Sequence, residues 1–329
     1  GVGYDVNSRL LDRLSRKNHG QSLYVRENDN LETVVANLYD KISLPVMTDV
    51  SIAFEFDGLK PEDGPPINRM YPKQVHDLCA GEQLVIAGRY RQSGRVKVTI
   101  TGKVDGHKQT LIFPVDLAEE SQDQSNIFVE KLWASRRIGE IIDQLDLVGK
   151  NQELIEELID LSTKHGIITP YTSFIADENA RLADRPGNLK KAAEAVTQLE
   201  EADGQVGFAQ RAEKAKFMNA ARPAAQTSYD AKDQAKWRDV ENDRLVSTKN
   251  VRRVANHSLY SRGKVWVTPK TEKLDLAKDA EKIRVVKRFS KEYFELMKRN
   301  NKDQNALLAQ QADGEQLLVH WHGENWLIK

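Results

Sequence analysis

The chain has 329 residues, which is enough for two or three domains. Its 49 Lys and Arg are balanced by 49 Asp and Glu, so the strongly basic field typical of nucleic-acid-binding proteins is absent. No run of apolar residues reaches the length of a membrane-spanning helix. A single cysteine, Cys79, excludes a disulfide framework within the chain.

Residues 1–45 have the pattern of alternating strands and helices. Gly1–Gly20 predicts the end of a buried strand, a polar turn and a short helix capped by Asn7 or Ser8. In this helix Leu10, Leu11 and Leu14 share one face. A strand at residues 22–25 follows, and Asn30 caps a second helix. The apolar stripe of that helix comprises Leu31, Val34, Val35, Leu38, Tyr39 and Ile42.

A strand–helix–strand–helix order is typical of a parallel α/β sheet. Two strands and two helices cannot cover both faces of such a sheet. We therefore expect that Gly1 is not the natural start, and that the other strands lie upstream of it or on another chain. Because sites in parallel α/β sheets lie on loops at the carboxyl ends of strands, most of them would precede Gly1.

Residues 46–120 change to a period of two. Val50, Ile52, Phe54 and Phe56 alternate with polar neighbours, and the same alternation returns after residue 95. Asp105-Gly106 is a strong hairpin signal, and Pro114 is typical of an edge strand. We predict a small antiparallel β-sandwich here.

Residues 121–175 predict a helical hairpin followed by an extended return segment. The first helix carries Trp133–Gly139, in which Arg136 and Arg137 can pair with Glu140 on a solvated face; an anion-binding arginine is the alternative. Residues 176–251 are rich in Ala and charged residues and predict a partly helical linker that buries little core. Residues 252–329 predict a compact α+β module with two hairpins.

The final hairpin contains the one arrangement that suggests a metal. His320 and His322 flank Trp321, so on a strand both imidazoles would face the same side. Two histidines at this spacing can ligate a metal, but no third ligand is identifiable. The sequence therefore assigns no catalytic, cofactor-binding or metal-ligating residue.

Several motifs carry a resemblance to a known family. The opening residues, from Gly1 to Leu14, resemble the last strand and helix of a von Willebrand factor type A domain. More narrowly, residues 1–175 resemble bacterial proteins related to inter-alpha-trypsin inhibitor heavy chains, which combine a vault/inter-alpha-trypsin domain, a type A domain and a β-rich and helical tail. The other matching stretches are Tyr39–Val46, Ala80–Val85, Gly88–Tyr90, Trp133–Gly139 and Gly166–Ser173.

The resemblance implies a multidomain α+β protein. Residues 1–45 would be the C-terminal edge of a type A domain, 46–120 the sandwich, 121–175 the helical hairpin, 176–251 the linker and 252–329 the last module. It implies a non-enzymatic adhesion or assembly protein that is secreted, periplasmic or at a bacterial cell surface. Its partner would be another protein, or the remainder of the same protein upstream of Gly1. Oligomerisation stays open, and no nucleic acid or membrane span is expected.

In the type A domain an Asp-x-Ser-x-Ser loop holds Mg²⁺ or a similar ion, to which a partner's acidic group binds. None of these ligands matches a position here, so an Mg²⁺ or Ca²⁺ site is expected upstream of Gly1. The alternative from another class is a metal-assisted hydrolase that uses His320 and His322 of the last module.

Overall fold

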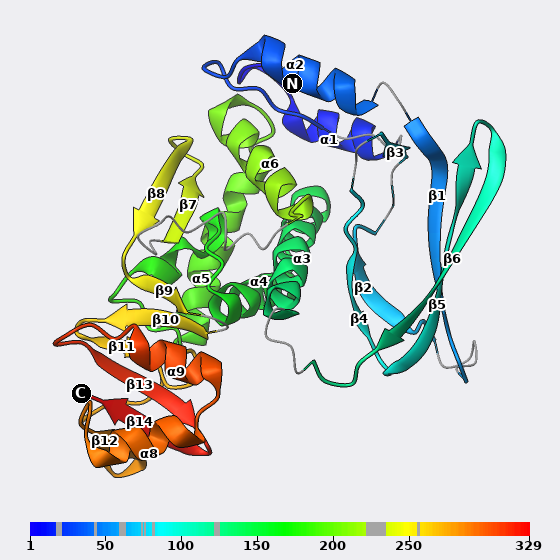
Figure 1. Ribbon diagram of the computed structural model, residues 1–329. Helices are drawn as coiled ribbons and strands as arrows, with labels where there is room; N and C mark the ends of the chain where they lie inside the picture. The colour runs from blue at the N-terminus through cyan, green and yellow to red at the C-terminus, as the bar shows by residue number, and fades with distance from the viewer. Residues whose placement is uncertain are drawn as a thin grey trace. The chain divides into compact units, whose positions relative to one another are not determined.

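The computed structural model covers residues 1–329 and is described here for residues 1–17, 22–42, 45–58, 64–73, 75, 77–80, 83–121, 126–221, 235–254 and 257–329. The chain divides into two compact units (Figure 1). Unit 1 comprises residues 1–140 and 201–221, and unit 2 comprises residues 141–200 and 222–329. Gly20, His76 and the 222–230 stretch lie outside the described residues.

Unit 1 begins with the predicted pair of helices. The helix α1 spans Ser8–Lys17 and α2 spans Leu31–Ile42. Asn7 caps α1 by accepting the N–H of Leu10 at 2.9 Å, and Asn30 caps α2 through the N–H of Thr33 at 2.9 Å. The predicted strand at residues 22–25 is reduced to a parallel bridge between Val2 and Val25.

The leucine face of α1 is not the face that the helix buries. Leu10 and Leu14 are exposed, whereas Ser8 is fully buried. The reason is that α1 packs against α6, the helix Gly204–Met218, through the side that carries Ser8 and Asp12. The leucine face therefore remains on the surface of unit 1.

The antiparallel strands predicted after residue 46 are confirmed. A four-stranded sheet has the order β3-β1-β5-β6, with β3 at Leu78–Cys79, β1 at Pro45–Phe56, β5 at Gly94–Val104 and β6 at His107–Leu117. A second, two-stranded sheet pairs β2, Ile67–Tyr71, with β4, Ala87–Tyr90. Asp105 and Gly106 both have left-handed backbones in the β5–β6 turn, as an Asp-Gly hairpin requires.

The long helix α3, Ile127–Val148, is confirmed, but the solvated position of its two arginines is wrong. Arg136 and Arg137 are both buried. Arg136 donates to the carbonyl oxygens of Tyr71, at 2.9 Å, and of Val85, and through Nε to that of Ala220 at 2.9 Å. Glu140 pairs with Lys73. The arginine head group finds enough backbone acceptors to be buried without a carboxylate partner.

The expectation that residues 176–251 bury little core is also wrong. In α6, Phe208 and Ala209 are fully buried and Phe217 nearly so. In unit 2, α5 spans Arg185–Val196 and buries Ala192 and Val196. Small residues allow close packing of helices without a wide apolar stripe, which explains why composition suggested a linker.

Unit 2 also contains α4, Gln152–His165, which Asn151 caps by accepting the N–H of Leu154 and which ends at the left-handed Gly166. The extended return segment is wrong at residues 170–176. Pro170–Ala176 forms the 3₁₀-helix η3, which a capping box between Thr169 and Thr172 begins. A second 3₁₀-helix, η4, spans Thr197–Glu200.

The C-terminal part of unit 2 is a mixed six-stranded sheet in the order β12-β14-β13-β11-β10-β9. Its strands are β9 Val251–Val254, β10 His257–Arg262, β11 Val265–Val267, β12 Ile283–Val286, β13 Gln316–Trp321 and β14 Glu324–Ile328. β12 runs parallel to β14, and β11 runs parallel to β13. A separate ribbon joins β7, Ala235–Asp239, to β8, Arg244–Thr248, and the 3₁₀-helix η5, Ala280–Lys282, precedes β12.

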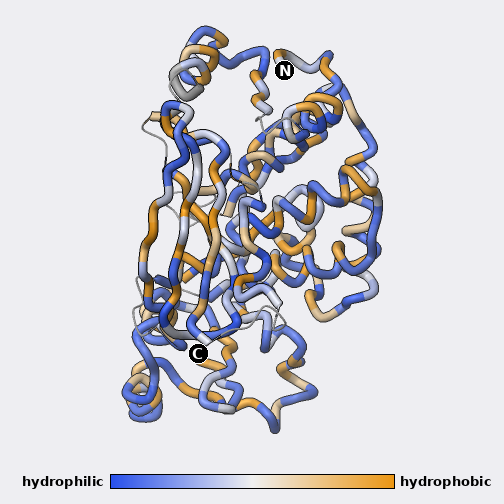
Figure 2. The backbone as a smooth tube through the Cα atoms, turned by 90° about the vertical axis from the view of Figure 1, so that its right-hand side faces the viewer, coloured by the Kyte–Doolittle hydropathy of each residue, from blue (hydrophilic) through white to orange (hydrophobic). Residues whose placement is uncertain are grey.

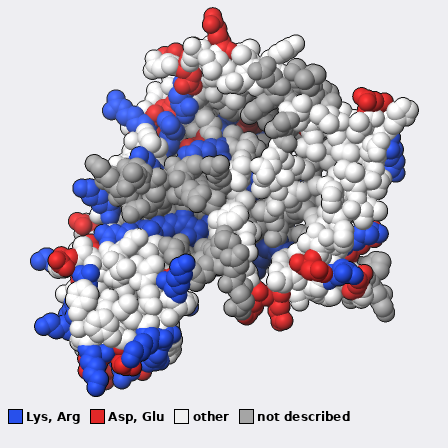
Figure 3. All heavy atoms as spheres, in the orientation of Figure 1, with Lys and Arg blue, Asp and Glu red and all other residues white. Residues whose placement is uncertain are grey.

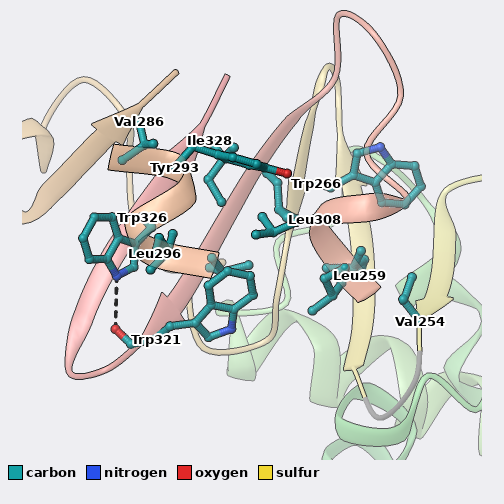
Figure 4. Packing of buried hydrophobic residues seen from close by; sticks show 13 residues of the cluster. Val254, Leu259, Trp266, Val286, Tyr293, Leu296, Leu308, Trp321, Trp326 and Ile328 are labelled. Atoms are coloured by element: carbon teal, nitrogen blue, oxygen red, sulfur yellow. Dashed lines mark hydrogen bonds between the residues drawn. The ribbon is translucent and has the colours of Figure 1, made fainter. Parts of the chain in front are cut away.

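Apolar cores form on both faces of this sheet. The helices α8, Lys291–Arg299, and α9, Lys302–Ala309, contribute Tyr293, Leu296, Leu307 and Leu308 to one core, together with three tryptophans (Figure 4). The other core includes Ile175 and Tyr260. Figure 2 shows hydrophobic and hydrophilic residues interspersed along the strands β1, β5 and β6 of unit 1, which face the viewer.

Candidate interaction surfaces

The first candidate surface lies at the start of unit 1. We call it the N-terminal surface. It consists of seven exposed apolar side chains, namely Val2, Leu10, Leu14, Leu23, Leu31, Val35 and Tyr39. The most exposed of the seven is Tyr39, at 67%. Exposed apolar residues in this number are typical of surfaces that another element covers.

A short parallel ladder holds together the two segments that carry this surface. Val25 donates its N–H to the carbonyl of Gly1 at 3.0 Å, and Gly3 donates to the carbonyl of Val25 at 2.9 Å. One residue that bonds to two residues of the neighbouring segment, here Val25 to Gly1 and Gly3, is the pattern of a parallel pair. The opening residues and residues 23–25 are therefore neighbours, as a parallel α/β sheet requires.

The helix α6 anchors this part of the chain from nearly 200 residues away. The Ser8 hydroxyl donates to the carbonyl oxygens of Ala202 at 2.8 Å and Gly207 at 3.1 Å. The rings of Tyr4 and Tyr24 meet Phe208 edge-on, with centroids 5.2 and 5.5 Å away. Such aromatic pairs stabilise beyond the area they bury.

A buried ion pair reinforces this anchor. The Lys214 ammonium lies 2.7 Å from a carboxylate oxygen of Asp12, and both side chains are largely buried. The other Asp12 oxygen and the carbonyl of Ser8 both lie within hydrogen-bond distance of the Tyr24 hydroxyl and share its one hydrogen. Burial first, and then the hydrogen bond to Asp12, raise the pKa of Tyr24 above its usual range. The phenol therefore stays neutral and keeps the carboxylate oriented.

The second candidate surface is one face of the β1-β5-β6 sheet. Three cross-strand rows put apolar side chains directly opposite one another, namely Phe56–Val96–Val115, Phe54–Val98–Phe113 and Ile52–Ile100–Leu111. Val96 is buried, whereas Phe113 is 47% and Leu111 is 46% exposed. The face is therefore covered at one corner and open along β6. We call this the β6 face.

The edge of β6 is less suited to pairing than its apolar face is to packing. Pro114 lies opposite Lys97 in the ladder and has no N–H to donate. A proline on an edge strand interrupts the row of donors that another strand would need. This composition favours burial of the β6 face against another layer over extension of the sheet by a further strand.

The two histidines do not form a metal site. His320 lies on β13, but His322 lies in the β13–β14 turn, where His322 and Gly323 both have left-handed backbones. His320 Nδ1 lies 2.8 Å from the Asn325 side-chain oxygen, and His322 Nε2 lies 2.9 Å from that of Asn300. The expectation that both imidazoles share one strand face is wrong, because the two-residue turn begins at His322.

No cluster of three or more His, Cys, Asp or Glu suited to a metal occurs among the residues that the structure describes. The Mg²⁺ or Ca²⁺ suggested by the resemblance therefore has no matching ligand set in the described part of this chain. Within the same residues no helix is long and apolar enough to cross a membrane.

Sequence reasoning missed the part that α6 plays in holding the N-terminal surface. Arg211 is fully buried and donates to the carbonyls of Glu201 and Gly207. Lys214 forms the ion pair with Asp12, and Phe208 contacts the two tyrosine rings. Because α6 is buried on several sides by charged as well as apolar residues, it has no amphipathic stripe to detect. The signal available was the pair Phe208 and Phe217 in an otherwise polar stretch.

Comparison with known proteins identifies relatives of two kinds. No protein-family profile matches the chain, and no solved structure matches it. The chain is 26% identical over 203 residues to inter-alpha-trypsin inhibitor heavy chain H3 of Mus musculus. The aligned region covers 57% of this chain and 22% of that protein. It is 22% identical over 202 residues to heavy chain H2 of Homo sapiens, which covers 56% of this chain and 20% of the relative.

The chain is therefore related to the inter-alpha-trypsin inhibitor heavy chains, which confirms the resemblance. It is also 24% identical over 179 residues to a von Willebrand factor A domain-containing protein of Dictyostelium discoideum, covering 53% of this chain and 20% of that protein. The matched region spans about a fifth of each of these relatives. The bacterial affiliation stays a prediction.

Proposed function

We propose that this chain is a non-enzymatic protein-interaction module that works outside the cytoplasm, in adhesion or in the assembly of other proteins. The observation that carries the proposal is the N-terminal surface beside the Val2–Val25 bridge. Two helices that leave apolar side chains exposed beside a single parallel bridge are suited to a larger sheet that buries them. The relationship to heavy chains and to a type A domain protein supports this interpretation.

The occupant of the N-terminal surface, in this proposal, is the remainder of a type A domain encoded upstream of Gly1. That remainder would contain the loop that holds Mg²⁺ or Ca²⁺, and the ion would accept an acidic group from the protein partner. This chain would supply the last strand, its helices and the layers that follow. A location in the periplasm, at the bacterial surface or in the medium is part of the same proposal.

The test begins with the encoded sequence immediately upstream of Gly1. If it holds the missing strands, that segment is produced separately and titrated against this chain by calorimetry. We expect saturable binding that the double substitution Leu10→Glu, Leu14→Glu abolishes, because two buried carboxylates would face apolar groups. The matched control is Leu245→Glu, an equally exposed leucine on β8.

Two results would contradict the proposal. One is an upstream sequence without strands of a type A domain. The other is binding that Leu10→Glu, Leu14→Glu and Leu245→Glu weaken to the same extent. In the assembled protein, partner binding should require Mg²⁺ or Ca²⁺ and should be lost with a chelator.

A further inference from the structure

The further inference concerns the outer edge of the C-terminal sheet in unit 2, at β12. In the described residues β12 has a strand neighbour on one side only, β14. Lys329 donates its N–H to the carbonyl of Val286 at 3.0 Å, and Arg288 donates to the carbonyl of Lys329 at 2.8 Å. Because peptide groups alternate in direction along a strand, Val285 and Lys287 direct theirs away from β14.

Two of the outward backbone groups on this edge are already hydrogen-bonded within local turns. The N–H of Ile283 donates to the carbonyl of Ala280, and the carbonyl of Lys287 accepts the N–H of Ser290. What remains is a compact set of outward groups, namely the Ile283 carbonyl, both peptide groups of Val285 and the Lys287 N–H. This set is what one residue of an added strand, with its two neighbours, needs for pairing.

Apolar side chains flank both faces of the edge. Val285 is 60% exposed on the face opposite to α8, since it alternates with Val286, which packs with Tyr293 and Leu296. On the α8 face, the rings of Phe289 and Phe294 lie 5.7 and 5.6 Å from that of Tyr293. Phe289 is 64% exposed and Phe294 is also exposed. An added strand would thus meet apolar contacts on alternate sides.

Phe289 adopts a left-handed backbone, with φ of 63°. This conformation is an outlier for a bulky side chain, and such strain tends to persist at functional positions. The conformation is fixed by the bond from Arg288 to Lys329 and by the cap of Ser290 on α8, whose hydroxyl accepts the N–H of Tyr293. The Arg288 guanidinium also lies 4.7 Å from the centre of the Phe289 ring. The fold therefore holds an apolar ring in solvent at a cost in backbone energy.

The charge around the edge indicates the chemistry of the partner. Residues 282–299 contain seven Lys or Arg and only two Glu, in a chain whose formal net charge is zero. Arg284, Arg288 and Lys298 pair with Glu324, Asp313 and Glu295 at 2.8, 3.1 and 2.8 Å. In the part of the chain that the structure describes, Lys287 and Lys291 form no ion pair. Figure 3 shows Lys and Arg gathered around the end of the module where Figure 1 places β12 and α8.

We propose that the β12 edge binds an extended, acidic segment of a protein partner by β-strand addition. Val285 would provide the central backbone pair, apolar residues of the partner would contact Val285, Phe289 and Phe294, and its carboxylates would pair with Lys287 and Lys291. The short strand and its lysines limit unselective edge pairing, while the exposed rings select the partner. This site is independent of the N-terminal surface and the β6 face.

The test uses the full chain and a fluorescein-labelled peptide of about ten residues that alternates Val or Phe with Glu or Asp, the pattern that an added strand requires. Fluorescence anisotropy should show saturable binding that weakens as salt is raised. A peptide of the same composition in scrambled order should bind at least about tenfold more weakly, since its apolar residues no longer share one side.

Two variants of Val285 isolate the backbone contact. Val285→Pro removes the outward N–H without touching the ladder to β14, and it should weaken binding at least about tenfold. Val285→Thr keeps the N–H and the β preference and should bind within about threefold of the parent. Far-ultraviolet circular dichroism and the thermal midpoint establish that the Val285→Pro variant is folded.

A variant of Phe289 keeps the proposal falsifiable should Val285→Pro fail to fold. Phe289→Gly relieves the left-handed strain, so it should leave the thermal midpoint unchanged or higher while weakening binding. Equal binding of ordered and scrambled peptides, equal effects of Val285→Pro and Val285→Thr in folded proteins, or unchanged binding by Phe289→Gly would each overturn strand addition.

Discussion

At the scale of single residues, breaking the buried Asp12–Lys214 pair should destabilise unit 1. Asp12→Ala leaves the Lys214 ammonium buried without the carboxylate that lies 2.7 Å from it, and it removes one of the two acceptors near the Tyr24 hydroxyl. We expect a loss of about 3 kcal/mol in the free energy of unfolding, measured by urea denaturation and circular dichroism. The control Lys97→Ala removes an exposed lysine that pairs with the exposed Glu55 on the neighbouring strand, and it should cost less than about 1 kcal/mol. Similar costs for the two variants would show that the buried pair contributes little.

Tyr24 predicts a dependence of stability on alkaline pH. Burial, followed by the hydrogen bond to Asp12, raises the pKa of Tyr24 above the ordinary value of 10.0, and burial likewise raises that of Tyr71. Below pH 10 both phenols are neutral in the folded and the unfolded chain. Above it the unfolded chain loses protons first, so the free energy of unfolding falls as pH rises.

The variant Tyr24→Phe separates the contribution of Tyr24 to the alkaline loss of stability from the contributions of other groups. It should cost about 1–2 kcal/mol at neutral pH through its lost hydrogen bonds. It should also make the decline above pH 10 shallower than in the parent, as urea midpoints at a series of pH values would show. An equally steep alkaline decline would mean that Tyr24 ionises without unfolding unit 1.

At the scale of elements, the close approach of α3 and α6 depends on Gly139. A Cβ at this position would lie 2.7 Å from the backbone nitrogen of Met218, and that atom cannot turn aside as a flexible side chain could. Gly139→Ala should therefore destabilise the chain by about 1–3 kcal/mol despite the better helix propensity of alanine. Thermal unfolding of both variants would measure this, and Lys190→Ala, at an exposed position of α5, should leave the stability nearly unchanged. A Gly139→Ala variant as stable as its parent would show that the two helices can separate freely.

The elements also show what could be predicted from periodicity. The helices at residues 8–17, 31–42 and 291–299, and the antiparallel strands after residue 46, follow patterns with one apolar face or a recognisable cap. The 3₁₀-helix at residues 170–176 was missed because a Thr capping box outweighs an apolar run. The segment that contains α6 was predicted to be partly helical, but its burial was not predicted, because the partners of α6 are distant in sequence.

At the scale of the whole molecule, a zero net charge combines with exposed apolar surfaces. Charge repulsion is then weakest near pH 7, while the N-terminal surface and the β6 face remain exposed. We expect the isolated chain to self-associate near pH 7 and to disperse as pH is moved about two units away, as static light scattering would show. Phe113→Glu and Leu111→Glu together should reduce association at pH 7, whereas Lys108→Glu, a change of similar charge on the same strand, should reduce it less. Equal reductions would assign the association to net charge alone.

The candidate surfaces were foreseen only in part. The opening residues indicated that two helices and a strand pair lack a cover, and the exposed Leu31, Val35 and Tyr39 agree with that expectation. The β12 edge could not be foreseen, because the sequence of residues 283–286 does not distinguish an edge strand from a central strand. The separation of His320 from His322 likewise depended on where the turn begins.

The sequence by itself determined most of the helices and strands, the family relationship and the excess of apolar residues near Gly1, since periodicity, capping and motif identity are properties of neighbouring residues. The tertiary structure decided which faces are buried. Arg136 lies among backbone carbonyls instead of in water, and Leu10 remains exposed while Ser8 is buried, because α6 returns to pack on α1 and α3. Burial is set by contacts between segments that are far apart along the chain, and no local pattern records them.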